Sequence, residues 1–147
     1  MENNNMAFIR RQGKTKIMWL PVAASAGAIA KGSLVIWASG YIVTATTTSV
    51  SNYTAGVLAK AIATTDADYA TVRLVPVEVP VEKFVTWTAD VTASLVVADR
   101  GLYQDLTNAY TVNRAAATYD IVQCVEVLST TKGVFILNIG PDAYPKA

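Results

Sequence analysis

The chain has 147 residues, no histidine, a single cysteine and a formal net charge of +1. These features exclude histidine-based catalysis and histidine-ligated zinc, and they disfavour a disulfide framework or a generally basic nucleic-acid surface. Charged residues make up only 16% of the sequence, against roughly 25% in ordinary soluble domains, so part of the surface is expected to be covered by a partner.

The first segment, residues 1–14, is polar and shows the periodicity of neither helix nor strand. Such a segment buries too little apolar surface to fold by itself, so the sequence predicts an extended N-terminal arm held by a neighbouring subunit or another protein. An acidic protein surface is favoured over nucleic acid as the partner of its basic residues. The residues expected to make these contacts are Phe8, Ile9, Arg10, Arg11 and Lys14.

Residues 15–140 predict an all-β domain. Short runs of β-branched and aromatic residues recur between clusters of Gly, Asn, Asp, Ser and Thr, which is the pattern of strands and turns. Strands are expected at residues 16–21, 33–38, 41–46, 56–63, 70–75, 82–88, 101–104, 109–113, 120–128 and 133–139. A helical turn, or alternatively a tight loop, is expected at residues 24–30 and 114–118, and residues 141–147 are expected to form a C-terminal tail.

Two parts of this domain share one order of elements. Gly32 and Gly101 each begin a hairpin, a polar loop follows, and a longer strand pair completes the part. The longer pairs are expected to join residues 56–61 to 72–75 and residues 120–125 to 134–137. Because two copies are too few for a solenoid, the sequence predicts that two similar hairpin pairs close into one small β-barrel or sandwich.

The segment of residues 76–82 alternates apolar and acidic residues and contains two prolines. Proline has no N–H to donate to a sheet, so this segment is expected at an edge or in a crossover strand. Such an edge is a candidate for contact with a neighbour through Val77, Val79 and Val81. Together with the low charge, the apolar run of residues 72–81 predicts a homo-oligomer, with a trimer favoured.

The sequence offers no pair of groups with matched catalytic roles, so no catalytic residue, cofactor or metal site is expected, and the chain is not expected to be an enzyme. Asp66, Asp68 and Asp120 lack the ligand series of a calcium loop and are interpreted as solvated turns. Cys124 lies in an apolar run and is expected to be buried. The aromatic residues are expected in the core or an interface, with a sugar-binding platform as the alternative. No apolar stretch reaches the roughly 18–20 residues of a membrane helix, so no membrane partner is expected.

The runs GSLVIW, YIVTAT, AGVLAKAI and VRLVP occur in this order, with a short turn after the first and a polar loop after the second. This series resembles the small bacteriophage head decoration proteins, which are also called capsid cement proteins. The resemblance extends over about residues 26–140 and does not include the N-terminal arm.

The resemblance implies a compact β-barrel that oligomerises, commonly as a trimer, and clamps neighbouring major capsid protein subunits on the outer face of the head. The chain is therefore expected at the outer surface of the capsid in the virion, as a structural protein that binds the major capsid protein and other copies of itself. The alternative is a phage tail or fibre β-domain that binds a receptor or a glycan.

Overall fold

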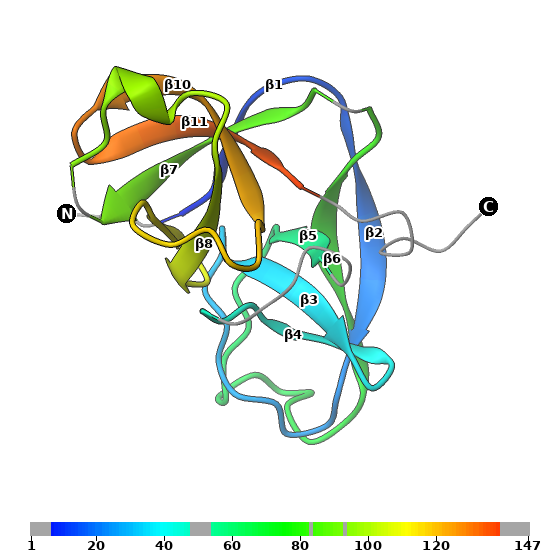
Figure 1. Ribbon diagram of the computed structural model, residues 1–147. Helices are drawn as coiled ribbons and strands as arrows, with labels where there is room; N and C mark the ends of the chain where they lie inside the picture. Colours follow the sequence, from blue (N-terminus) through cyan, green and yellow to red (C-terminus); the bar gives the residue numbers. More distant parts are fainter. Residues whose placement is uncertain (1–6, 48–53, 83, 93, 139–147) are drawn as a thin grey trace, which may run out of the picture.

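The computed structural model describes residues 7–47, 54–82, 84–92 and 94–138, so the predicted tail at residues 141–147 lies outside the described residues. Within the described residues the fold is all-β, as predicted, and its strands form two sheets (Figure 1). The helical element of this part of the chain is the 3-10 turn η2 (Val97–Asp99).

The first sheet is the N-terminal unit, with five antiparallel strands in the order β2-β6-β5-β3-β4. Its outermost strands, β2 and β4, lie in contact, but no backbone ladder joins them. The unit is therefore an open barrel. Its strands are β2 (Thr15–Val22), β3 (Leu34–Ala38), β4 (Tyr41–Thr44), β5 (Thr54–Leu58) and β6 (Arg73–Pro80).

The second sheet is the C-terminal unit, in which the order β7-β11-β10-β8-β9 returns to its start through a parallel pairing of β7 with β9. The unit is therefore a closed five-stranded barrel. A further strand, β1 (Ile9–Gln12), pairs antiparallel with the first half of β7. The strands of the barrel are β7 (Thr86–Thr92), β8 (Tyr103–Asn108), β9 (Thr111–Asn113), β10 (Val122–Ser129) and β11 (Lys132–Leu137).

The two units have the same strand order, with β2 to β6 corresponding to β7 to β11. The same backbone bonds recur at the start of each hairpin. The Gly32 N–H donates to the Leu58 carbonyl at 2.8 Å, and the Gly101 N–H donates to the Cys124 carbonyl at 2.7 Å. Both glycines have a φ of 88°, a conformation that favours glycine. The predicted recurrence of two similar hairpin pairs is confirmed.

The strand pair β5–β6 forms as predicted, but with a different register. Val57 lies opposite Glu78 rather than opposite residues 72–75. The difference arises because Asp66 folds the preceding segment into a loop of its own. The Asp66 carboxylate accepts a backbone N–H at 2.8 Å and binds the Arg73 guanidinium at 2.9 Å, so that β6 begins only at Arg73.

Strand β6 is not an edge strand, which corrects the prediction drawn from its prolines. It pairs with β2 along one side and with β5 along the other. Pro76 is tolerated because its carbonyl accepts the Ala59 N–H at 2.9 Å, while its missing N–H faces the short strand β5. Pro80 lies beyond the residue pairs that join β6 to β5.

Residues 24–30 and 114–118 form loops rather than helical turns. In the second loop, the buried carboxylate of Asp105 accepts three backbone N–H groups at 2.8–2.9 Å, those of Thr118, Tyr119 and Asp120. A side chain that satisfies backbone donors in this way competes with a helix, which would use the same groups.

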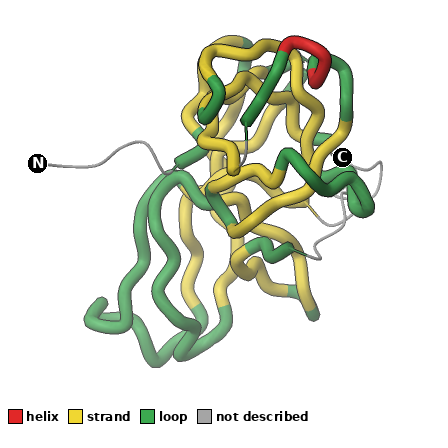
Figure 2. Tube along the Cα trace, turned by 60° about the vertical axis from the view of Figure 1, so that its left-hand side comes forward, coloured by secondary structure: helices red, strands yellow, loops and turns green. Residues whose placement is uncertain are grey.

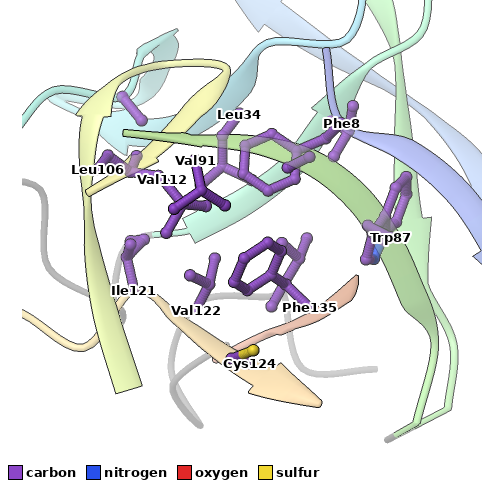
Figure 3. Close-up of a cluster of buried hydrophobic side chains, with 14 of the residues drawn as sticks. Phe8, Leu34, Trp87, Val91, Leu106, Val112, Ile121, Val122, Cys124 and Phe135 are labelled. Carbon is purple, nitrogen blue, oxygen red and sulfur yellow. The ribbon is translucent and has the colours of Figure 1, made fainter. Parts of the chain in front are cut away.

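Each unit has its own hydrophobic core. The core of the C-terminal unit also contains side chains from outside its barrel, among them Phe8 before β1 and Leu34 of β3 (Figure 3). Val57 of β5 belongs to the same core. The Leu34 N–H also donates to the Ala109 carbonyl at 2.7 Å. The units therefore pack directly against each other, and Figure 2 shows their strands as adjoining groups.

Candidate functional site

An exposed apolar surface lies on the outward side of the ribbon formed by β2 and β6, the two long strands at the right of Figure 1. Trp19 and Leu74 are each 60% exposed there. We call this surface the β2–β6 face and define it by five side chains, Ile17, Trp19, Pro21, Leu74 and Pro76. Trp19 lies directly opposite Pro76, and Pro21 lies opposite Leu74.

Strand geometry produces this face, because successive side chains point to opposite sides of a sheet. One row of β2 and β6 fills the core of the N-terminal unit, and the other row is exposed. Both rows are largely apolar, and within β6 only Glu78 marks the outer row by its polarity. The inner row consists of Met18, Leu20, Val22, Val75, Val77 and Val79.

Three of the predicted contact residues lie in the cores. Val77 and Val79 occupy the inner row of β6, and Phe8 is 2% exposed in the core of the C-terminal unit. This corrects the prediction that these side chains present apolar surface to a partner, because they are already covered by their own chain. Ile9 and Val81 are exposed.

The basic residues of the predicted arm bind carboxylates of their own chain. Arg10 Nε lies 2.7 Å from Glu78 Oε2, and Arg11 Nη1 lies 3.3 Å from Glu126 Oε1. At Lys14 it is the backbone N–H, not the side chain, that donates to a carboxylate, Glu82 Oε2 at 2.9 Å. The pairing with carboxylates expected between subunits is therefore corrected to an intrachain one, and it fixes β1 to both units. Exposed pairs of this kind contribute only about 0–1 kcal/mol each.

Asp99 is a buried carboxylate in the turn before β8. It accepts the Val96 N–H at 2.8 Å, and Arg114 Nε lies 3.0 and 3.2 Å from its two oxygens. Burial acts to raise the pKa of Asp99, but the hydrogen bonds from Val96 and Arg114 outweigh it and hold the pKa below its ordinary value. A carboxylate held ionised by its own loop is suited to fixing that loop.

Asp66 and Asp68, interpreted from the sequence as solvated turns, both bind the buried side chain of Arg73, whose Nη1 lies 2.9 and 2.8 Å from their oxygens. The backbone hydrogen bond from Ala63, followed by the contacts with Arg73, lowers the pKa of Asp66 despite the opposing effect of burial. No group of three or more His, Cys, Asp or Glu residues in the described part of the chain could hold a metal ion.

Cys124 is buried, as predicted. Burial raises the pKa of its thiol, which keeps the thiol protonated and disfavours it as a nucleophile.

The chain matches no model of a protein family, and no curated protein matches it either. Among the described residues, no helix is long and apolar enough to cross a membrane. The β2–β6 face is an exposed apolar surface of the kind through which proteins bind partners. The sequence-based prediction named Val77 and Val79 in the buried row of β6 and did not include the exposed residues Ile17, Trp19 and Leu74.

Proposed function

We propose that this chain is a structural decoration protein of a bacteriophage capsid, which binds the outer surface of the head and stabilises contacts between major capsid protein subunits. The observation that carries the proposal is the β2–β6 face, where Trp19 and Leu74 are largely exposed on two long paired strands. The resemblance of about residues 26–140 to cement proteins supports the same role. This role requires no catalytic residue and no cofactor.

The face has the physical properties of a protein-binding surface. Burying apolar area contributes about 25 cal/mol per Å², and tryptophan is among the residues that dominate interface energies. Trp19 and Leu74 stand on a hydrogen-bonded ribbon, so little backbone freedom is lost when a partner covers them. A binding protein that has to withstand strain between coat subunits benefits from such a rigid surface.

The resemblance to cement proteins also implies contact between copies, and we propose a homotrimer. A second exposed apolar group lies around η2 on the C-terminal unit and consists of Val96, Val97 and Leu102. The two groups lie on different units, so one can meet the coat while the other meets a neighbouring copy. Mass measurement of the purified protein tests this, and a strictly monomeric species at high concentration that makes no copy–copy contact on the particle contradicts it.

The test of the main proposal uses particles of the phage that encodes the chain. Cryo-imaging is expected to show the protein on the outer capsid lattice. In co-sedimentation with heads that lack the protein, Trp19→Ala is expected to weaken binding by about tenfold or more, because large aromatic side chains form interface hot spots. The matched control is Leu128→Ala, which truncates an exposed side chain on β10 of the other unit and is expected to leave binding unchanged.

The alternative, a tail or fibre domain that binds a receptor or glycan, is favoured by the same exposed indole, because a sugar ring can stack on it. The two functions predict different locations. Density at the tail tip, together with loss of glycan binding in Trp19→Ala, would establish the alternative and overturn the decoration role.

A further inference from the structure

At the outer edge of β2, backbone groups have no strand partner among the described residues. The Val81 N–H donates to the Lys14 carbonyl at 3.1 Å, which shows that Lys14 faces β6. Hydrogen bonding alternates along an antiparallel pair, so the even-numbered residues of β2 face β6, and the N–H and C=O groups of Ile17 and Trp19 point away from it. Within the described residues, β2 pairs with no strand on that outer side.

The edge of the C-terminal unit that is equivalent to the outer edge of β2 lies on β7. Met18 of β2 lies opposite Val77, which lies opposite Leu58 on its other side. In the same way, Trp87 of β7 lies opposite Phe135, which lies opposite Cys124. Met18 and Trp87 therefore occupy corresponding places in the two units. The neighbours of Met18 on β2 therefore correspond to the neighbours of Trp87 on β7.

On β7, this edge is occupied by a strand. Thr86 and Thr88 are paired with β1, in which Ile9 lies opposite Thr88. The corresponding residues of β2, Ile17 and Trp19, have no such strand among the described residues. The chain thus shows, in one copy of its repeated unit, an antiparallel strand seated at the position that is open in the other.

The side chains at the open edge indicate the chemistry of the missing strand. Lys16 is exposed and forms no ion pair within the described part of the chain. A strand beside β2 would place one side chain next to Lys16 and side chains of the opposite row next to Ile17 and Trp19. A carboxylate suits the first position, and apolar side chains suit the second.

The same chemistry disfavours a second copy of β2 as the occupant. Two copies paired with Lys16 opposite Lys16 would place like charges directly across the strands, which is destabilising. Lys16 and Pro21 also match the devices by which natural edge strands avoid pairing with themselves. The edge therefore fits a different chain.

We propose that the outer edge of β2 at Ile17–Trp19 binds an extended segment of the major capsid protein as an added antiparallel strand, with a carboxylate of that segment next to Lys16. This inference rests on the proposed function and specifies how the coat is held. Main-chain hydrogen bonds supply the attachment, and the neighbouring β2–β6 face supplies apolar contact with alternate side chains.

The test separates the backbone contact from the side-chain contact. Ile17→Pro removes the outward N–H as well as the isoleucine side chain. Ile17→Thr replaces the same side chain but keeps the N–H. Proline is tolerated at edge positions whose N–H faces solvent, and Pro21 already occupies the same outer row of β2. In co-sedimentation with heads that lack the protein, Ile17→Pro is expected to bind roughly tenfold more weakly than Ile17→Thr.

A charge test accompanies it. Lys16→Glu is expected to weaken head binding severalfold, whereas the same change at Lys31, an exposed residue of the turn before β3, is expected to have no effect. Amide hydrogen exchange of the wild-type protein gives a readout that needs no variant. The Ile17 and Trp19 amides are expected to exchange faster than those of Met18 and Leu20 in the free protein, and to become protected on heads.

The outcomes distinguish the two levels of the proposal. If the wild-type protein binds heads but Ile17→Pro and Ile17→Thr bind alike, or if the Ile17 and Trp19 amides gain no protection on heads, strand addition is overturned and the decoration role stands. If the wild-type protein does not bind heads, both are overturned. Should Ile17→Pro fail to fold, the amide exchange of the wild-type protein alone settles the question.

Discussion

The two units have the same strand order, yet one is closed and the other is open. In the C-terminal unit the parallel pair β7–β9 closes the barrel, with Asp90 opposite Thr111. In the N-terminal unit β2 and β4 meet without a ladder, and Pro21 stands at the place that corresponds to Asp90. Proline has no N–H to donate, so Pro21 cannot form a hydrogen bond from β2 to β4 where the two strands meet. Closure of a barrel can therefore depend on very local chemistry.

The units also bury opposite charges. The open unit buries Arg73, whose Nε and Nη2 find no partner among the described residues. The closed unit buries Asp99 and Asp105, and both carboxylates accept backbone N–H groups of neighbouring loops. Carboxylates can fix several backbone donors at once, whereas the guanidinium of Arg73 binds only side chains here. The buried charges thus hold loops in different ways, through backbone donors in the closed unit and through Asp66 and Asp68 in the open one.

The largest expected effect concerns how β1 joins the closed unit. Phe8→Ala is expected to lower the free energy of unfolding by about 3–5 kcal/mol, because it removes a buried aromatic side chain from the core of the C-terminal unit. Urea unfolding measures the change. The control Ile9→Ala truncates an exposed neighbour and should change stability by about 0.5 kcal/mol or less. A change at Phe8 as small as at Ile9 would show that β1 is not part of that core.

The next prediction uses pH to examine a carboxylate of the closed unit. The pKa of Asp99 is lowered in the folded protein, so its contribution to stability is fully present above the ordinary aspartate pKa and is lost as the pH falls through the folded value. Stability is therefore expected to decrease below about pH 4. In Asp99→Asn this part of the decrease should be absent, as thermal unfolding at a series of pH values would show. An unchanged pH profile contradicts the prediction.

The smallest effect concerns the place where β2 and β4 meet without a ladder. Pro21→Thr supplies an N–H toward β4, and the bond gained, about 0.5–1.5 kcal/mol, is offset by about 0.4–1 kcal/mol from the loss of proline rigidity in the unfolded chain. The control is Pro80→Thr, which loses the same rigidity at a place where β5 does not pair with β6. Pro21→Thr is expected to be the more stable variant, with a protected amide at position 21. Equal stability of the two variants would mean that side-chain packing, and not the missing N–H of Pro21, keeps β2 and β4 unpaired.

Much of the fold could be predicted from the sequence because its signals are local. Gly32 and Gly101 mark the same positive-φ turn in each unit, and β-branched runs mark the strands that follow. The exact register of β6 could not be predicted, because it depends on Asp66 and Arg73 meeting across a loop. Strand β1 was also missed, since a short segment rich in Arg and Gln acquires strand geometry only by pairing with the distant β7.

The candidate site was harder to predict than the fold. Alternation along residues 76–82 was visible, but which row faces the core depends on the position of β6 between β2 and β5. The same uncertainty applied to β2, where Trp19 and Leu20 are both apolar and only the folded sheet shows that Trp19 is the exposed one. A free strand edge has no sequence signal of its own, because it is defined by the absence of a neighbour.

The pairing of Ile9 with Thr88 has a consequence for the order of events during synthesis. Strand β1 leaves the ribosome before the N-terminal unit, and its partner β7 is made only after that unit. At about 5–20 residues per second, β1 waits for several seconds before the closed barrel can complete the burial of Phe8. The nascent chain therefore passes through a stage in which the open barrel can be complete while Phe8 still lacks the closed barrel that buries it, and this is the stage at which assistance from a chaperone would matter most.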